Sequence, residues 1–206
     1  MHYCQGCEQP VVLEPGAAAG SQSRCPRCGQ AGEAWVTKPL FAVTGASGAG
    51  KSTLLAPLAA SLAGRCVTFD ADWLLDAAGA LSGGQPINWT AFGSAWLAVA
   101  HGAAQSGLPT VLLGPTVPAN LEAQPLRRWL GPIYYLLLDC PDDIRRRRMA
   151  DRPTWRSHDI DEQVSFGRWL RDNIPARVDT SRGTPENVAA EVAAWVTGRL
   201  GDRETG

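Results

Sequence analysis

The sequence predicts an α/β protein in which a five-stranded parallel sheet is flanked by helices, with a small zinc ribbon at its N-terminus. Three observations lead to this prediction. Short apolar runs alternate with helical patterns over residues 40–201, which is the order that produces a parallel sheet covered on both faces. The first of these runs leads into a loop of the form G-x-x-x-x-G-K-S. Four of the six cysteines form two C-x-x-C pairs within the first 30 residues.

Length and composition fit one α/β domain with a small appendage. The chain has 206 residues, of which 45% are hydrophobic and 19% charged, as expected for a globular protein that buries a core. We expect the zinc ribbon to span residues 1–36 and the main domain residues 37–201. The main domain is expected to contain a lid over about residues 145–172, and residues 202–206 to form a polar tail.

The charge and the N-terminus indicate the expected location. A net charge of −1 offers no general attraction to nucleic acid or to a membrane surface. The N-terminus has neither the basic start nor the apolar run of a signal peptide. The chain also lacks an apolar stretch near the roughly 20 residues that a spanning helix needs. We therefore expect a cytoplasmic protein without a membrane partner, and the sequence leaves its oligomeric state open.

The elements of the main domain follow from hydrophobic periodicity and from capping residues. The expected strands cover residues 40–44, 65–69, 108–113, 133–139 and 176–180. Helices are expected at 52–63, over 73–107 with a break at 83–86, at 121–130, from Asp142 onward, and from Thr184 onward. Thr184 is the expected N-cap of the last helix, with proline in its first turn.

The loop between the first strand and the first helix matches a phosphate-binding motif at every fixed position. Its glycines let backbone N–H groups turn toward a polyphosphate at the positive end of a helix. Lys51 would reach the β- and γ-phosphates, and the Ser52 hydroxyl would ligate Mg²⁺. A mere glycine-rich turn would not satisfy so many fixed positions. We expect ATP or another nucleoside triphosphate to bind at Gly45, Ala46, Ser47, Gly48, Ala49, Gly50, Lys51, Ser52 and Thr53.

The N-terminal cysteines have the spacing of a four-thiolate zinc site. Cys4 and Cys7 form one pair, Cys25 and Cys28 the other, and seventeen residues separate the pairs. Four thiolates leave no position open for water, so we expect a structural Zn²⁺ and not a catalytic one. The alternatives are two disulfides, which a reducing cytosol disfavours, or a redox C-x-x-C, which would need its own βαβ unit.

Polar and acidic residues follow the expected strands at their carboxyl ends. In an open parallel sheet, ligands bind beyond these ends, so one cleft can collect residues from several strands. The residues at these positions are Gly45, Asp70, Asp72, Gly114, Asp139 and Asp179.

Residues 40–200 resemble the P-loop kinases of small molecules, the group that includes adenylate, shikimate and gluconate kinases. The run from Leu138 to Asp143, followed by Arg148 and Arg152, is similar to the segment that leads into the adenylate kinase lid. There, two arginines four residues apart contact the ATP phosphates. The resemblance implies a catalytic role for Arg148 and Arg152, whose spacing would place them on one helix face.

Other arginines near the expected lid have less specific interpretations. Arg146 and Arg147 are expected on a solvated helix face. The sequence leaves open whether Arg156, Arg168 and Arg171 belong to the lid and its return helix.

Two further segments carry the resemblance. The Asp70-Ala71-Asp72 segment is similar to the Asp-x-Asp motif of shikimate kinase. This implies that Asp72 orients or deprotonates the acceptor hydroxyl and that Asp70 lies near Mg²⁺. Helix capping is the alternative role for this pair. The loop after the last strand resembles the one that borders the nucleotide base in these kinases, which implies that Arg182 and Gly183 contact adenine mainly through their backbone.

The chain departs from adenylate kinase on the acceptor side. The third strand of that family ends in Asp-Gly-Phe-Pro-Arg, whereas here Leu113 is followed by Gly-Pro-Thr-Val-Pro. No lysine or arginine occurs from Cys66 to Leu126, although a phosphate-bearing acceptor normally requires such cations. Aromatic and polar side chains suit an uncharged hydroxyl compound, and this span offers Trp73, Gln85, Asn88, Trp89, Trp96 and His101.

These observations favour an ATP- and Mg²⁺-dependent phosphotransferase that moves the γ-phosphate of ATP to a hydroxyl of a small molecule such as a nucleoside or a sugar. The first alternative is a nucleoside-monophosphate kinase. An alternative of another class is a nucleic-acid-associated NTPase or polynucleotide kinase, although the ribbon offers only Arg24 and Arg27 as cations. A regulatory guanine-nucleotide switch would need an Asn/Thr-Lys-x-Asp motif, which the sequence lacks.

Overall fold

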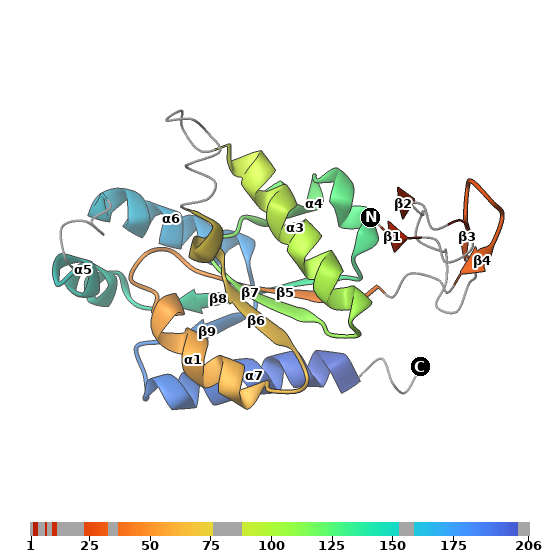
Figure 1. Ribbon diagram of the computed structural model, residues 1–206. Helices are drawn as coiled ribbons and strands as arrows, with labels where there is room; N and C mark the ends of the chain where they lie inside the picture. Colours follow the sequence, from red (N-terminus) through yellow and green to blue (C-terminus); the bar gives the residue numbers. More distant parts are fainter. Residues whose placement is uncertain are drawn as a thin grey trace.

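A computed structural model describes residues 2–3, 7, 10–11, 23–32, 37–75, 88–152 and 159–201 (Figure 1). At its centre lies a five-stranded sheet whose strands follow the order β6-β7-β5-β8-β9, with all neighbours parallel. This confirms the predicted fold class. The strands are β5 (Leu40–Thr44), β6 (Val67–Asp70), β7 (Thr110–Leu113), β8 (Ile133–Asp139) and β9 (Arg177–Asp179).

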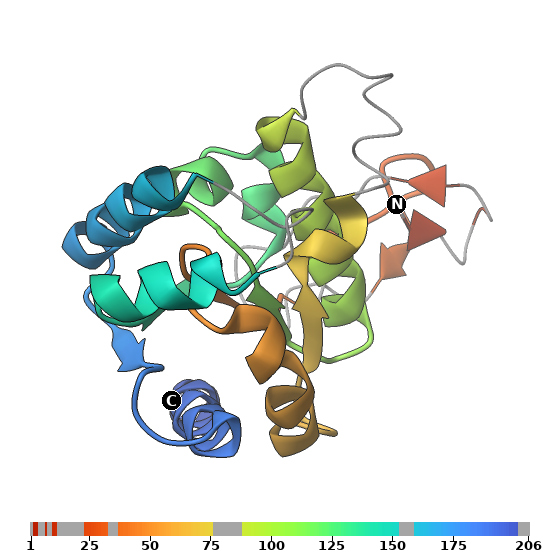
Figure 2. The ribbon, with the colours of Figure 1, turned by 90° about the vertical axis from the view of Figure 1, so that its left-hand side faces the viewer.

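Helices cover both faces of the sheet (Figures 1 and 2). On one face, α1 packs beside α7, and on the other α3 packs against α4 and η2. Two further helices, α5 and α6, contact each other near the carboxyl end of β8. The bounds are α1 (Lys51–Ser61), η1 (Ala71–Leu74), α3 (Trp89–Gln105), α4 (Pro118–Glu122), η2 (Pro125–Trp129), α5 (Asp142–Ala150), α6 (Ile160–Asn173) and α7 (Pro185–Gly201).

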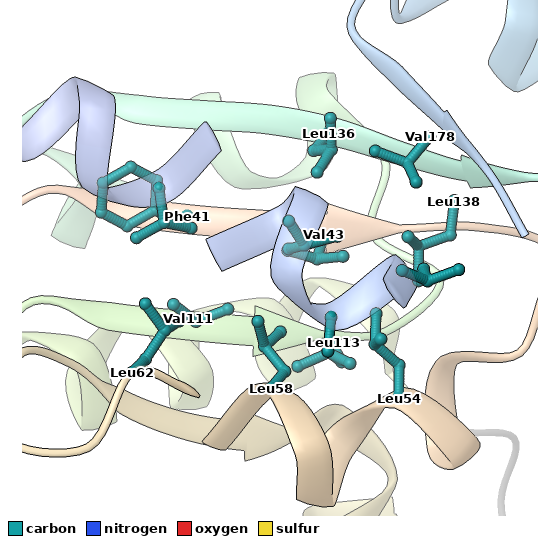
Figure 3. Close-up of a cluster of buried hydrophobic side chains, with 14 of the residues drawn as sticks. Phe41, Val43, Leu54, Leu58, Leu62, Val111, Leu113, Leu136, Leu138 and Val178 are labelled. Atoms are coloured by element: carbon teal, nitrogen blue, oxygen red, sulfur yellow. The ribbon is translucent and has the colours of Figure 1, made fainter. Parts of the chain in front are cut away.

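The central strand β5 supplies both hydrophobic layers. Phe41 and Val43 point toward α1 and α7, whereas Leu40 and Ala42 point toward α3 and α4 (Figure 3). This division follows from the two-residue period of a strand. Because both faces are covered, the strand is a continuous apolar run without polar alternation. Because β5 is buried on both faces, it fixes the position at which the following loop begins.

Two predicted elements differ from the observed ones. The single helix expected at 121–130 is wrong, because α4 ends at Glu122 and a separate 3₁₀ turn begins at Pro125. Gln124 is extended, with φ −76° and ψ 139°, as proline requires of the residue before it. The helical segment expected from Trp73 begins earlier, as the 3₁₀ turn η1 at Ala71, and its continuation after Leu75, with the expected break at 83–86, lies outside the described residues.

Capping side chains fix the starts of two long helices. The Asn88 side chain accepts a hydrogen bond of 3.0 Å from the backbone N–H of Ala91 at the start of α3. At α7, the Thr184 hydroxyl accepts from the Asn187 N–H at 3.4 Å, and Thr184 N–H donates to Asn187 Oδ1 at 3.1 Å. This reciprocal pair satisfies backbone donors that a helix start leaves unpaired, as expected of Thr184.

The N-terminal segment forms two small antiparallel pairs. One joins β1 (His2–Tyr3) to β2 (Pro10–Val11), and the other joins β3 (Ser23–Arg24) to β4 (Ala31–Gly32). These strands lie beyond the amino end of β5, on the side opposite the phosphate-binding loop (Figure 1). Within the described ranges, no helix has the length and apolar character that a membrane span requires.

Candidate phosphotransfer site

The glycine-rich loop occupies the turn between β5 and α1. Gly48 and Gly50 have φ angles of 81° and 90°, in the left-handed region that favours glycine. Gly50 is also the N-cap of α1, so the loop ends where the helix dipole is positive. This is the backbone geometry that anion binding at a helix start requires.

Lys51 lies at the centre of the site. Its Nζ donates to the carbonyl oxygens of Gly45 at 2.6 Å and Ala46 at 3.2 Å. Burial lowers the pKa of Lys51 from 10.5 to about 8, although attraction to Asp72 opposes this shift. Repulsion from Arg152 lowers the pKa further. The ammonium therefore lies within electrostatic reach of an acidic side chain and a second cation.

Arg145 fixes the loop to the sheet. Its side chain is fully buried and forms a 2.8 Å ion pair with Asp139 at the end of β8. The same guanidinium donates to the Ser47 carbonyl at 2.9 Å. Gln163 of α6 binds the same residue at its preceding peptide group, where the side-chain oxygen accepts from the Ser47 N–H at 2.9 Å. The loop is thus held from both α5 and α6.

Sequence reasoning missed Arg145, because it stands first in a run of four arginines that resembles a solvated helix face. The available signal was its spacing to Met149, since both residues form the buried side of α5. The guanidinium also lies against Gly167 of α6, where a Cβ atom would come within 3.0 Å of Arg145 Nη2. The next two members of the run, Arg146 and Arg147, are exposed, as expected.

Arg168 and Arg171 extend this ionic network and are paired with carboxylates. Arg171 Nε donates to Asp139 at 2.6 Å and its Nη2 to Asp142 at 2.7 Å, while Arg168 pairs with Asp142 at 2.8 Å. The hydrogen bond with Asp139 raises the pKa of Arg171. Burial alone would raise the pKa of Asp142, but its bonds to Arg171 and Arg168 hold it below the usual range. Arg156 lies outside the described residues.

A cleft of about 440 Å³ opens beside the loop, within the usual size range of small-ligand sites. It extends from the loop across α1 to the segment that precedes α7. Its lining residues are Gly48, Gly50, Thr53, Leu54, Arg148, Asp151, Arg152, Thr180, Gly183, Thr184, Pro185 and Val188.

Arg148 bridges the two walls of this cleft. Its guanidinium donates to the Gly48 carbonyl at 3.2 Å, and to the Thr180 hydroxyl and carbonyl at 3.0 and 2.7 Å. Arg152 lines the same cleft, but the expectation of one shared helix face is wrong, because α5 ends at Ala150. The two arginines converge from a helix and from the turn that follows it.

The predicted base contacts divide into one residue that lines the cleft and one that does not. Gly183 is a lining residue. The side chain of Arg182 is 87% exposed and pairs with Asp179 at 3.2 Å, and Arg182 is not among the lining residues.

Asp70 and Asp72 lie at the carboxyl end of β6, where both raise the pKa of Lys51 by electrostatic attraction. Asp70 is 7% exposed, and its Oδ1 accepts from the Asp72 N–H at 3.0 Å. It therefore caps the η1 turn, which was the alternative role. Asp72 is exposed. Gly114 allows η1 to pack closely on β7, because a Cβ atom there would be 2.4 Å from the Ala71 Cβ.

Three of the four predicted zinc ligands can be described, and they cluster. The sulfur atoms of Cys7, Cys25 and Cys28 all lie within 4.8 Å of one another, and Cys4 lies outside the described residues. Backbone N–H of Arg27 donates to the Cys25 sulfur at 3.4 Å. Tetrahedral zinc with Zn–S bonds of about 2.3 Å places its sulfurs roughly 3.8 Å apart, and Cys7 and Cys25 are 3.9 Å apart. The cluster is compatible with a zinc ribbon.

Comparison with known proteins identifies the family. A family model described as an AAA domain matches residues 40–171, so the chain belongs to this AAA domain family. A search of curated proteins found no match.

Solved structures share the fold at low sequence identity. The tunicamycin resistance protein of Deinococcus radiodurans matches with a TM-score of 0.60 and 18% identity, covering 77% of this chain and 95% of that protein. A putative kinase of Chloroflexus aurantiacus gives 0.57 and 19%, covering 81% and 97%. The shikimate kinase of Acinetobacter baumannii gives 0.51 and 18%, covering 80% and 96%. The main domain therefore has a P-loop kinase-like fold, as predicted.

The pKa of Lys51 predicts a pH dependence of nucleotide binding. Only the ammonium form attracts phosphate, so above pH 8 we expect the affinity for an ATP analogue to fall, by up to about tenfold per pH unit. Titration calorimetry between pH 7.5 and 9.5 measures this affinity, and Lys51→Met should bind the analogue weakly with no dependence on pH.

The lowered pKa of Lys51 acts on folding stability with the opposite sign. Since the unfolded chain holds this proton up to pH 10.5, stability should rise between about pH 8 and 10.5. If the affinity for the ATP analogue does not change between pH 7.5 and 9.5, the assignment of Lys51 as the phosphate-binding ammonium is contradicted.

Arg145 and Arg147 provide a matched comparison within one helix. Arg145→Met leaves the carboxylate of Asp139 without its buried partner, so we expect the free energy of unfolding to fall by about 3–5 kcal/mol. Arg147→Met removes an ion pair to Asp143 whose side chains are 71% and 72% exposed, and it should cost under about 0.5 kcal/mol. Urea unfolding of both variants measures the difference. Equal losses would show that Arg145 does not anchor the loop.

Proposed function

We propose that the protein is an ATP- and Mg²⁺-dependent phosphotransferase that moves the γ-phosphate of ATP to a hydroxyl of a small molecule. One observation carries the proposal. The phosphate-binding loop that carries Lys51 borders a cleft lined by Arg148 and Arg152, and Asp72 follows β6, where its charge raises the pKa of Lys51. A donor phosphate and an acceptor hydroxyl would meet between these groups.

The nucleotide would occupy the 440 Å³ cleft. Its phosphates would accept hydrogen bonds from the loop N–H groups and from Lys51, which would release the carbonyl oxygens of Gly45 and Ala46. Arg148 and Arg152 line the same cleft and would stabilise the charge on the transferring group. The base would lie toward the segment that contains Gly183, contacting its backbone.

Oxygen donors suited to Mg²⁺ lie beside the loop. Ser52 is exposed in the first turn of α1, and Asp70 has one carboxylate oxygen engaged with the Asp72 N–H. A hydroxyl and a carboxylate oxygen are the hard ligands that Mg²⁺ prefers, so these residues fit the ion. We assign Ser52 Oγ and Asp70 Oδ2 to the metal or to its bound water. When bound, Mg²⁺ neutralises charge on the β- and γ-phosphates.

Asp72 would serve the acceptor. As the acceptor oxygen bonds to the γ-phosphorus, the bond from that phosphorus to the bridging oxygen of ADP breaks, and the hydroxyl proton must move to a base. Asp72 is exposed and close enough to Lys51 to raise its pKa, so its carboxylate can accept this proton. The anchored loop would hold the phosphate in line with that hydroxyl.

The acceptor is proposed to carry no phosphate. Residues 66–126 contain no lysine or arginine, and Arg168 and Arg171 already pair with Asp139 and Asp142. This weakens the alternative of a nucleoside-monophosphate kinase. The ribbon arginines Arg24 and Arg27 are exposed but few, which gives little support to a nucleic-acid partner.

We further propose that residues 1–36 form a ribbon held by a structural Zn²⁺ on Cys4, Cys7, Cys25 and Cys28, separate from the kinase domain over 37–201. The clustering of three of these sulfurs supports the zinc site. The position of the ribbon strands, beyond the amino end of β5, supports a role away from the transfer chemistry (Figure 1).

Asp72→Asn tests the phosphotransferase proposal. An amide cannot accept the hydroxyl proton, so kcat should fall about 10²–10⁴-fold with an active acceptor, while ATP affinity stays within about twofold. ATP consumption would first be screened against nucleosides, sugars and nucleotides to find that acceptor. Asp172→Asn, an exposed residue of α6, is the control and should retain full activity. Failure of the wild-type protein to phosphorylate any hydroxyl compound would refute the proposal.

Cys25→Ser tests the zinc site. We expect the purified protein to carry about one zinc per chain and the variant to carry almost none, because a structural site needs all four thiolates. Metal content is measured by mass spectrometry, with Cys66→Ala as a control that removes a thiol buried in the main core. ATP affinity should change little in Cys25→Ser. Four oxidised cysteines without zinc would instead establish disulfides.

A further inference from the structure

A second pocket lies beside η1, on the acceptor side of the sheet. Its volume is about 110 Å³, and its walls come from η1, the first turns of α3 and the segment between β7 and α4. The lining residues that matter here are Trp89, Phe92, Trp96, Thr116, Val117 and Leu121. We call it the ring pocket for the reason that follows.

Aromatic side chains of α3 form one wall of the ring pocket. Phe92 meets Trp89 and Trp96 edge to face, with ring centroids 5.7 and 6.5 Å apart. Trp96 is 3% exposed, and its indole N–H donates to the Ala71 carbonyl at 3.2 Å, so this wall is rigid. Trp89 is 56% exposed, a large apolar surface beside a pocket. A planar ring bound there would cover this surface and pack against aromatic edges.

The size and polarity of the ring pocket restrict its ligand. A cavity of about 150 Å³ accepts one benzene molecule, so a pocket of 110 Å³ takes in only part of a planar ring, and the rest of the ring would lie over the exposed face of Trp89. Among the described residues, no charged side chain lines it. Thr116 Oγ1 is buried without a hydrogen-bond partner among the described residues, and the Asn120 side chain is the other polar group. An uncharged ring with a hydrogen-bonding atom would satisfy that hydroxyl, whereas a phosphate would meet no cation.

The ring pocket adjoins the transfer chemistry. Ala71, one of its lining residues, stands between Asp70 and Asp72. On the opposite side, the Thr116 carbonyl accepts from the Thr44 hydroxyl at 2.8 Å, and Thr44 directly precedes the phosphate-binding loop. A ligand whose ring fills the pocket would therefore extend a substituent toward Asp72 and Lys51.

From these observations we infer that the acceptor is an uncharged hydroxyl compound with a planar ring, such as a nucleoside or an aromatic alcohol, and that its ring binds in the ring pocket. This inference rests on the proposed phosphotransferase function. The acceptor oxygen bonds to the γ-phosphorus, ADP leaves with the electrons of the broken bond, and Asp72 takes the hydroxyl proton.

The substrate class is tested by comparing acceptors that differ in one feature. Adenosine, thymidine and benzyl alcohol carry an uncharged ring, the corresponding nucleoside monophosphates add a phosphate, and ribitol and glycerol lack the ring. We expect at least one of the ring compounds to exceed both other groups in kcat/KM by at least about tenfold. A preference for the monophosphates or for the ringless alcohols would overturn the inference and leave the phosphotransferase proposal intact.

The site is tested with variants of its wall. Trp89→Ala and Thr116→Val should each raise the acceptor KM by about tenfold, with the KM for ATP unchanged. Trp169→Ala is the matched control, because this tryptophan of α6 is 42% exposed and does not line the ring pocket. Unchanged acceptor KM values in both wall variants would overturn the assignment of the site.

A direct binding measurement separates the two proposals. We expect the ring compounds to bind saturably by titration calorimetry without nucleotide, and the binding to weaken in Trp89→Ala. Such binding without any phosphoryl transfer would support the ring pocket and count against the phosphotransferase function. If none of the ring compounds binds, or if ribitol binds as well, the ring pocket inference fails.

Discussion

The site depends on the buried ion pair between Arg145 and Asp139. Asp139 ends β8, so its carboxylate is fixed by the sheet, and Arg145 extends that position to the Ser47 carbonyl in the phosphate-binding loop. Two nitrogens of the buried guanidinium are paired, Nη2 with Asp139 and Nη1 with the Ser47 carbonyl, whereas Nε has no partner among the described residues; the two pairings specify one loop position. Gln163 of α6 binds the N–H of the same residue, so α5 and α6 both contact the phosphate-binding loop at Ser47. The cleft and Arg148 lie next to this anchor.

The charges around Lys51 are divided between two sides. Arg148 and Arg152 line the nucleotide cleft, whereas Asp70 and Asp72 face the lysine from β6. Burial lowers the pKa of Lys51, and attraction to the two carboxylates offsets part of that decrease. Phosphoryl transfer has little covalent chemistry for a protein to assist, so such an arrangement of fixed charges is what the reaction needs. In this arrangement the arginines lie on the side of the cleft, and the carboxylates lie on the side proposed for the acceptor.

Local patterns predicted much of the fold and less of the site. β5 and β8 match the predicted ranges because buried strands are continuous apolar runs. The prediction of one helix over 121–130 was wrong because the chain is interrupted before Pro125, an effect of proline that the sequence alone already indicates. Arg145 could not be distinguished from its exposed neighbours, since its burial depends on Asp139 and on a glycine of α6. The side chain of Arg182 pairs with Asp179 and is exposed, so a base contact by this residue stays a prediction about its backbone. Local periodicity does not show which side chains of different helices and strands will pair.

The close packing at Gly114 lies beside the ring pocket. Gly114 ends the third strand in sequence, and the absence of a side chain lets Ala71 approach β7 closely. Ala71 and Thr116 both line the small, mainly apolar ring pocket, so this approach forms one part of its wall. In such a pocket an unpaired charge would lose its hydration without gaining a partner. Under the proposed function, the close packing of η1 would therefore both position Asp72 and disfavour charged acceptors.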